Sequence, residues 1–395
     1  MMLRNDPGLS TLAAWGGETD PHGYRAAQVP IVQSAPFVYP DVATWRAVID
    51  GTQAGDIYSR NTNPTVAVFE EKARLLEGGE AATAFASGMA AISNTLFAIL
   101  RPGDRVVSIK DAYGGTSRIF LEMLEPIGIA VTLVETDDAA ALDAAVRAGC
   151  RMVYVETPTN PTMKIIDLAR VAAAARSVGA LMMVDNTFAS PINQRPIALG
   201  ADLVVHSATK FLGGHDDAIG GVLVGRRDLV EQVFRYREIT GAALAPFAAY
   251  LLLRGMKTLD LRVQRQNANA LAVATHLERD ARVERVFYPG LASHPSHAVA
   301  AAQMRGFGGV LGFSLKGGEA AAVRLLDALR LAHRGASLGS VNTLAGLPGM
   351  TSHVEVTPED RAALGIPEAL IRYSCGIEDV ADLIADLDQA LDAAG

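Results

Sequence analysis

A lysine follows the end of an apolar stretch in the middle of the chain. Residues 202–205 (Asp-Leu-Val-Val) are apolar enough for a buried strand, and Lys210 comes five residues later, after the hydroxyl residues Ser207 and Thr209. A lysine partly shielded from water has a lowered pKa, so its amine becomes a nucleophile that can form a Schiff base. Hydroxyl groups donate hydrogen bonds to phosphate oxygens. The stretch therefore predicts a nucleophilic Lys210 beside a phosphate group; the alternative is an ordinary solvated lysine.

A carboxylate ends another apolar stretch. Asp185 is the last residue of the run 181–185 (Leu-Met-Met-Val-Asp). Burial raises the pKa of a carboxyl group unless a cation lies near it. Asp185 is therefore expected either to cap the next turn or to face a cationic ligand group, such as a protonated pyridine nitrogen.

Three further segments have residues suited to a flat, phosphorylated ligand. Ser87, Gly88 and Met89 open a helical pattern, and the unpaired amides of a helix start can bind an anion, although many structural helices also begin with Ser-Gly. Tyr113 follows the apolar run 105–109, where its ring can stack on a planar group. Arg60 lies near the N-terminus, where it can bind phosphate.

Arg372 lies inside the apolar stretch 370–376. Arginine is rarely buried without a partner. Its predicted partner is a substrate carboxylate, and the alternative is an Asp or Glu of the chain itself.

The elements that must position these residues are short apolar runs alternating with helical patterns. Runs of this kind predict a mainly parallel sheet covered by helices on both faces. Ligands of such sheets bind at the carboxyl ends of the strands. The predicted strands are 105–109, 130–134, 152–156, 181–185 and 202–205.

The pattern divides the chain into three predicted parts. Residues 1–60 are punctuated by proline, show no helical period before 42–49, and are expected to form an arm that lies on a neighbouring subunit. Residues 61–250 are expected to form the ligand-binding domain. Residues 251–395 are expected to form a smaller α+β domain; the predicted elements around and within it are a long helix over 248–279, strands over 283–287 and 309–315, and helices over 319–332 and 380–393.

Composition excludes several classes of function. Half of the 395 residues are hydrophobic, 20% are charged and the net charge is −8, so no nucleic-acid partner is expected. The longest apolar run, 242–253, is too short to span a membrane. The start does not look like a signal peptide, and the two cysteines and the histidines lack metal-ligand spacing. We expect a cytoplasmic protein without a metal.

Together these segments resemble the Cys/Met-metabolism family of enzymes that depend on pyridoxal 5'-phosphate (PLP). The resemblance runs from about Gln28 to the C-terminus, and its most specific stretches are the surroundings of Lys210 and residues 58–65, 156–161 and 337–339. It implies the fold type I of PLP-dependent transferases, with a mainly parallel seven-stranded sheet. It also implies PLP as cofactor, an amino-acid substrate, and a homotetramer built from two dimers with shared active sites.

The resemblance also implies roles for individual residues. Lys210 would carry PLP as a Schiff base and then move protons, Asp185 would pair with the ring nitrogen, and Tyr113 would stack on the ring and act as acid or base. The remaining implied roles are cofactor binding by Ser87, Gly88, Met89, Ser207 and Thr209, by Asn160 beside the ring and by Tyr58 and Arg60 from a neighbouring subunit, and substrate binding by Ser337, Arg372, Arg118 and Tyr58.

Three positions bear on which reaction is catalysed, and a fourth departs from the family's pattern without a functional explanation. Gly115 stands where typical bacterial methionine γ-lyases have cysteine, whereas Arg118 matches an arginine that binds a distal carboxylate in cystathionine-type enzymes. Ala336 stands where many of those enzymes have glutamate, and Asp216 replaces a common serine. We predict γ-elimination of the cystathionine γ-lyase type, giving 2-oxobutanoate, ammonia and a thiol.

Three alternatives stay open at this point. One is a γ-replacing transferase, either a cystathionine γ-synthase or an O-acylhomoserine sulfhydrylase. Another is a methionine γ-lyase-like enzyme with a different leaving group. The last belongs to a different class, a PLP-fold scaffold with a binding role only.

Overall fold

The computed structural model describes residues 7–18, 25–352, 354 and 357–395. Its larger sheet has seven strands and confirms the mainly parallel arrangement. Six strands run in one direction, and only β7 is antiparallel to both of its neighbours. In spatial order the strands are β1 (Ala81–Phe85), β7 (Gly221–Gly225), β6 (Leu203–Ser207), β5 (Leu181–Asp185), β4 (Met152–Glu156), β2 (Arg105–Ile109) and β3 (Ala130–Val134).

Helices cover both faces of this sheet because successive side chains of each strand point to opposite sides. At the β1–β7 end, Phe85 and Leu223 belong to one apolar core, while their neighbours Ala84 and Val222 belong to another. The first core includes α4 (Gly88–Ile99) and α9 (Arg227–Thr240), and the second includes α3 (Pro64–Glu77) and α10 (Pro246–Met256). The remaining helices of this part are α5 (Gly114–Arg118), α6 (Ala139–Arg147), α7 (Leu168–Ser177) and α8 (Ser190–Asn193).

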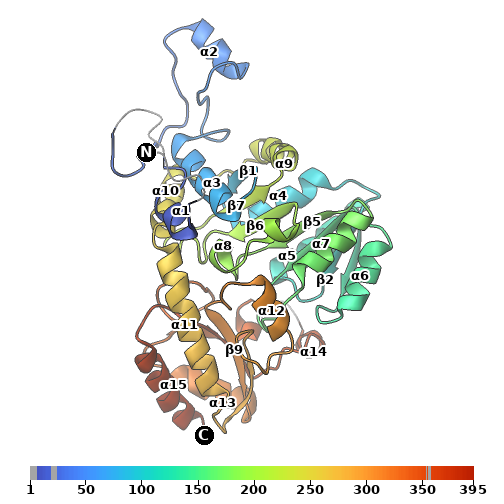
Figure 1. Cartoon of the computed structure of the whole chain (residues 1–395), viewed down its shortest axis with the longest axis vertical. Helices are drawn as coiled ribbons and strands as arrows, with labels where there is room; N and C mark the ends of the chain where they lie inside the picture. The colour runs from blue at the N-terminus through green and yellow to red at the C-terminus, as the bar shows by residue number, and fades with distance from the viewer. Residues whose placement is uncertain (1–6, 19–24, 353, 355–356) are drawn as a thin grey trace.

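A second, five-stranded sheet forms the lower part of the molecule (Figure 1). Its order is β10 (His333–Arg334), β11 (Leu344–Gly346), β12 (Leu370–Ser374), β9 (Val310–Leu315) and β8 (Val283–Phe287). Helices α13 (Gly318–Ala328) and α15 (Val380–Ala394) pack beside each other against it. Helices α12 (His297–Gln303) and α14 (Pro358–Ala363) complete this part.

The long helix expected over 248–279 is two helices. Helix α10 ends at Met256 and α11 (Leu259–Leu277) begins three residues later. The carbonyl of Gly255 accepts hydrogen bonds from the Thr258 hydroxyl and the Arg262 guanidinium. These side chains satisfy backbone groups at the break, and α11 runs from there along the lower part (Figure 1).

No helix had been expected before residue 42, but the N-terminal segment contains one. Helix α1 (Leu9–Trp15) packs against α3 and α11. The buried Lys72 ammonium donates to the Ala13 carbonyl and pairs with Glu18 at 2.5 Å. Parts of the predicted arm, 1–6 and 19–24, lie outside the described residues.

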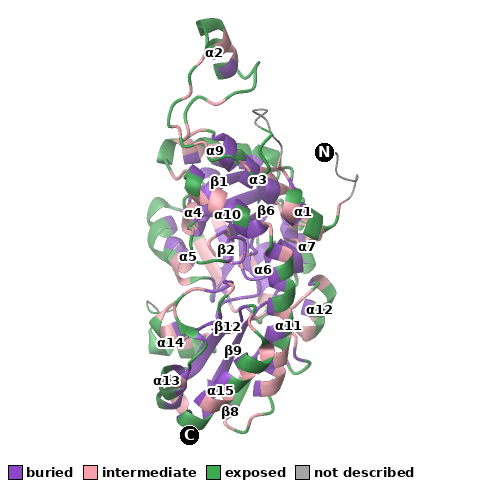
Figure 2. Ribbon diagram, turned by 90° about the vertical axis from the view of Figure 1, so that its left-hand side faces the viewer, coloured by how far each residue is buried: buried purple, intermediate pink, exposed green. Residues whose placement is uncertain are grey.

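Helix α2 (Val42–Ile49), by contrast, extends away from the body (Figure 1). Its surroundings are largely exposed in Figure 2, whereas the central strands β4, β5 and β12 are buried. No helix in the part of the chain that the structure describes is long and apolar enough to cross a membrane.

Candidate active site

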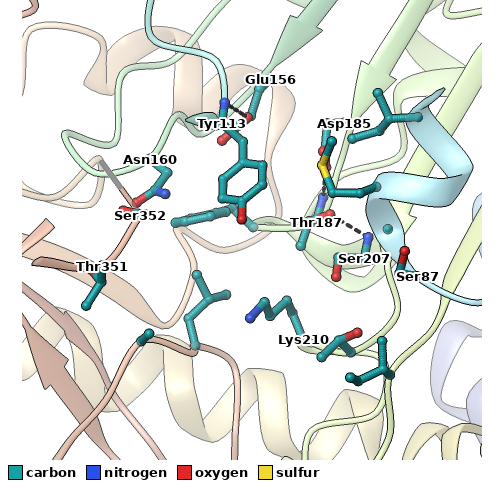
Figure 3. Close-up of a pocket in the computed structure, with 18 of the residues that line it drawn as sticks. Ser87, Tyr113, Glu156, Asn160, Asp185, Thr187, Ser207, Lys210, Thr351 and Ser352 are labelled. Carbon is teal, nitrogen blue, oxygen red and sulfur yellow. Dashed lines mark hydrogen bonds between the residues drawn. The ribbon is translucent and has the colours of Figure 1, made fainter. Parts of the chain in front are cut away.

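A cavity of about 310 Å³ lies at the carboxyl ends of β4, β5 and β6, between the two sheets. Its wall combines residues that are far apart in the sequence, from the first turn of α4 to β12 (Figure 3). Its lining is Ser87, Gly88, Met89, Ile92, Tyr113, Glu156, Asn160, Asp185, Thr187, Phe188, Ser207, Thr209, Lys210, Ile219, Ala336, Leu338, Thr351, Ser352 and Arg372. It therefore brings together most of the residues predicted from the sequence.

The inner end of the cavity, formed by Asp185, Glu156 and Thr187, is acidic. Asp185 accepts hydrogen bonds from the Thr187 amide at 2.9 Å and from the buried Tyr154 hydroxyl at 3.3 Å. Burial raises the pKa of Asp185, and hydrogen bonds from Thr187 oppose that rise. A buried carboxylate of this kind suits a cationic partner, as expected if Asp185 faces a pyridine nitrogen.

The start of α4 forms an anion cradle beside β6. The Ser87 hydroxyl caps the helix by accepting from the Ala90 amide, and the residues that follow it, Gly88 and Met89, line the cavity. A Cβ at Gly88 would lie 2.7 Å from the Cβ of Ser207, so only glycine allows this close approach. The helix start and the two hydroxyl residues of the next segment, Ser207 and Thr209, therefore converge as expected for a phosphate site.

Lys210 extends into the cavity, and its ammonium donates to the Ser337 hydroxyl at 3.1 Å. Burial lowers its pKa, and the cationic Arg372 lowers it further, while Asp216 opposes the shift. An amine with a lowered pKa is a better nucleophile at neutral pH. Lys210 thus lies half-buried in the cavity, at the position that the sequence-based prediction requires.

Tyr113 faces Lys210 across the cavity, and its hydroxyl points into the space that Lys210 also enters (Figure 3). The ring is 41% exposed, but its backbone is fixed, since the Tyr113 amide donates to the Glu156 carboxylate at 2.9 Å.

Arg372 reaches the cavity from β12 and is 4% exposed. It donates to the Asn160 side chain at 3.1 Å and to the carbonyls of Ala336 and Ser337 at 3.1 and 3.2 Å. These neutral acceptors orient the guanidinium without neutralising it. Burial lowers the pKa of Arg372 to about 10, so it stays cationic at neutral pH and its charge is available to a carboxylate.

Four predicted residues do not line the cavity of this chain: Arg118, Tyr58, Arg60 and Ser337. Ser337 contacts the cavity residue Lys210 through its hydroxyl. Arg118, in α5, pairs with Glu122 at 3.1 Å, and its side chain is half exposed. Arg60 stacks on the Tyr58 ring at 5.2 Å, in the exposed segment between α2 and α3.

Several lining residues were not assigned a role from the sequence. Glu156 was noted only as part of a motif, although its position at the end of a buried strand, like that of Asp185, was a usable signal. The residues of the outer wall, which are Ile219, Ala336, Leu338, Thr351 and Ser352, come from irregular segments with no periodicity. Of these, only Ala336 had been singled out.

The sequence pattern of the Cys/Met metabolism PLP-dependent enzymes matches residues 10–392. The chain belongs to this family. The enzyme is 46% identical to an L-methionine gamma-lyase of Pseudomonas putida over 98% of both chains, and 41% identical to a cystathionine gamma-lyase of Bacillus subtilis over 97% of this chain and 98% of that one. A solved cystathionine gamma synthase from Xanthomonas oryzae pv. oryzae, in complex with cystathionine, is 40% identical and superposes with a TM-score of 0.93 over 98% of this chain and 99% of that one. The enzyme thus belongs to a group of PLP-dependent γ-eliminating and γ-replacing enzymes.

The residues present fit PLP. One cavity holds a group suited to each part of the cofactor. The desolvated Lys210 suits its aldehyde, the buried Asp185 suits its ring nitrogen, and the start of α4, packed closely on Ser207, suits its phosphate. In the described part of the chain no group of side chains could hold a metal ion, and the family has PLP as its cofactor.

Proposed function

We propose that the enzyme catalyses γ-elimination on a sulfur-containing L-amino acid whose γ-substituent is uncharged, with 2-oxobutanoate, ammonia and a thiol as products. The observation that carries the proposal is the uncharged outer wall of the cavity. Among the described lining residues, the charged ones are Glu156, Asp185, Lys210 and Arg372, and all lie toward the cofactor or the substrate α-carboxylate.

A charged distal group would need a partner of its own. Burying an unpaired charge is strongly unfavourable, and cystathionine carries both an amino group and a carboxylate at its distal end. Arg118, which was expected to bind such a carboxylate, lies outside the cavity lining and pairs with Glu122. The geometry therefore favours a neutral thioether over cystathionine, the substrate type predicted from the sequence.

The proposed roles follow from the positions of the side chains. Ser87, Gly88, Met89, Ser207 and Thr209 hold the cofactor phosphate, Asp185 holds the ring nitrogen, and Asn160 lies beside the ring. The cofactor, attached through Lys210, supplies an electron sink that makes the Cα–H bond of an amino acid acidic.

The chain's own groups then move the protons. Arg372, with the Ser337 hydroxyl, binds the substrate α-carboxylate and so orients Cα toward Lys210. The neutral Lys210 amine accepts the proton at Cα, would pass that proton on to the bound cofactor, and is then neutral again and accepts the proton at Cβ. The Tyr113 hydroxyl, which shares this space, donates a proton to the leaving sulfur.

The second candidate is γ-replacement on an activated homoserine, because the same cavity can accept an incoming thiol instead of releasing one. The superposition on a cystathionine gamma synthase supports this candidate. Sulfide is the better match for the incoming nucleophile, since it brings no distal charge to the outer wall.

We further propose that residues 61–250 act as the cofactor-binding domain and 251–395 as the C-terminal domain, and that the arm over 1–60 brings Tyr58 and Arg60 to the cofactor and substrate site of a neighbouring subunit. The exposed apolar side chains of the arm support a homotetramer of two dimers; Val38 is 93% and Trp45 48% exposed. A cytoplasmic location stays a prediction.

A substrate panel tests the function. The purified holoenzyme is incubated with L-methionine, with L-cystathionine, and with O-succinyl-L-homoserine plus cysteine or sulfide, while 2-oxobutanoate, ammonia and thioether or homocysteine are measured. We expect 2-oxobutanoate and a thiol from methionine at a higher kcat/KM than from cystathionine. A preference for cystathionine would contradict the neutral-substituent assignment, and a thioether or homocysteine product without 2-oxo acid would favour the transferase.

A further inference from the structure

Glu156 is a buried acid of the inner end that the proposed reaction does not use. It is the last residue of β4, 3% exposed, and lies in register with Asp185, the last residue of β5. Paired residues of parallel strands point to the same face of a sheet, so both carboxyl groups face the cavity. Only one of them, Asp185, has a proposed partner in the cofactor.

The contacts of Glu156 join two segments of the active site. Its carboxyl group accepts a hydrogen bond from the Tyr113 amide at 2.9 Å (Figure 3), and the backbone N–H of Asn160 also acts to lower its pKa. Tyr113 is the residue before the short helix α5, and Asn160 lies in the loop after β4, where its side chain contacts Arg372. The hydrogen bond to the Tyr113 amide therefore ties the end of β4 to the segment that leads into α5.

This anchor matters for Tyr113, because the residue is only partly enclosed by its neighbours. The ring is 41% exposed and stands at the mouth of the cavity, whereas the acid that holds its backbone is buried. A shift of the Tyr113 backbone would move the phenol relative to Lys210.

Isolation of Glu156 from water also bears on its charge. Burial and the neighbouring Asp185 raise the pKa of Glu156, and the two backbone N–H groups oppose the rise. The hydrogen bond to Tyr113 is thus coupled to the charge on Asp185, which a bound cofactor would change.

We propose that Glu156 is a positioning residue, whose carboxylate holds the Tyr113 backbone so that the phenol stays over the cavity and its hydroxyl faces the Lys210 side. The role of that hydroxyl in releasing the thiol rests on the proposed function. The position of the Tyr113 ring is independent of the proposed function. In this proposal Glu156 acts through Tyr113 and takes no part in the proton transfers.

The test compares Glu156→Ala, which removes both acceptors, with Glu156→Gln, which keeps one acceptor oxygen. We expect Glu156→Ala to lower kcat about 10²-fold through misplacement of the phenol, with little change in KM, and Glu156→Gln to recover most of the loss. The circular dichroism of the bound cofactor should change in the alanine variant, because it reports the ring's surroundings. Glu135→Ala is the matched control, since Glu135 follows strand β3 of the same sheet but its side chain is half-exposed and pairs with Lys110.

A double variant separates positioning from a general structural role. If Glu156 acts through Tyr113, then Glu156→Ala should lower kcat much less in a Tyr113→Phe background than in the natural enzyme. Full additivity, or an unchanged cofactor signal and kcat in Glu156→Ala, would overturn the proposal. If Glu156→Ala does not fold, as thermal melting would show, the same additivity test with Glu156→Gln decides.

Failure of this proposal can be told from failure of the proposed function. The cofactor signal is measured without substrate, so it tests the position of the ring even if methionine is not the substrate. If the natural enzyme releases no 2-oxo acid, the proposed γ-elimination is wrong. The proposal for Glu156 is then tested by the cofactor signal alone.

Discussion

The inner end of the cavity and its outer wall differ in how the chain builds them. Asp185 and Glu156 end adjacent strands of one sheet, and their positions are fixed by the strand register and by hydrogen bonds to backbone amides. The outer wall comes from loops of both halves of the chain, and Ala336 and Ile219 in it are largely exposed. Strand ends tolerate little movement, whereas loops accept substitution. We therefore expect the chemistry common to the family to depend on the inner end and the choice of substrate to depend on the outer wall.

The largest effect should come from removing the nucleophile of the inner side. We expect Lys210→Ala to lower kcat by at least about 10²–10⁴-fold, because the variant lacks the amine that moves protons. Release of 2-oxo acid measures this. Lys110→Ala, at an exposed lysine paired with Glu135, is the control and should keep full activity. Full turnover by Lys210→Ala would refute the mechanism.

Replacing Arg372 by lysine tests the α-carboxylate site. A lysine keeps the charge but loses the fork of donors held by Asn160 and two carbonyls, at a cost of about 1.5–3 kcal/mol, or roughly 10- to 10²-fold in kcat/KM. Steady-state kinetics measure the loss. Arg118→Lys should change kcat/KM little, and an equal loss in both variants would return Arg118 to the substrate site.

A methyl group at Gly88 tests how tightly the inner side is packed. The added Cβ would lie 2.7 Å from the Cβ and 2.9 Å from the Cα of Ser207, and overpacking of this kind costs about 1–3 kcal/mol. We expect a lower free energy of unfolding and weaker cofactor retention, measured by denaturant titration and by absorbance after dialysis. Gly335→Ala meets only a Leu344 methyl at 3.4 Å and should show neither effect. If Gly88→Ala changes neither the free energy of unfolding nor the retention of cofactor, then α4 can shift to make room for the methyl group.

A charge introduced into the outer wall should alter the choice of substrate with little effect on the chemistry. Ala336→Glu supplies an acceptor for a distal amino group, so the ratio of kcat/KM for cystathionine to that for methionine should rise about tenfold, equivalent to about 1.4 kcal/mol. Parallel kinetics with both substrates measure the ratio. Ala336→Gln is the control for size. A similar rise of the kcat/KM ratio in Ala336→Gln would mean that the size of the side chain, and not its charge, causes the effect.

The smallest expected effect is a shift of the pH dependence of Lys210. Asp216 raises the lysine pKa against the dominant effect of burial, so Asp216→Ser should lower that pKa further. The neutral amine is the form that reacts with the cofactor, so the apoenzyme of the variant should begin to take up cofactor quickly at a lower pH. The shift should be less than about one pH unit, because Asp216 is exposed and solvent screens its charge. A shift to higher pH would contradict this sign. Asp217→Ser is the control.

Local patterns in the sequence were enough to predict the strands that consist of continuous apolar runs. The strands that end at Ile109, Glu156 and Asp185 were predicted at their observed bounds, because continuous β-branched and apolar runs between helical patterns have few other solutions. Strands β1 and β7 were missed, since the first is made mostly of alanine and the second is framed by glycines. Helix α1 was missed as well, because it depends on Lys72 and Glu18, which approach it only after folding.

The sequence alone determined the kind of chemistry. The motif around Lys210, the strand-end Asp185 and the helix start at Ser87 are local signals, and each carries its function in residue type and short spacing. Only the tertiary structure decided which distant residues share the cavity. It placed Arg118 outside the lining, joined Glu156 to Tyr113 and brought Arg372 from the second sheet to Asn160. The physical reason is that strand register and the packing of two sheets set these distances, and no short stretch of sequence encodes them.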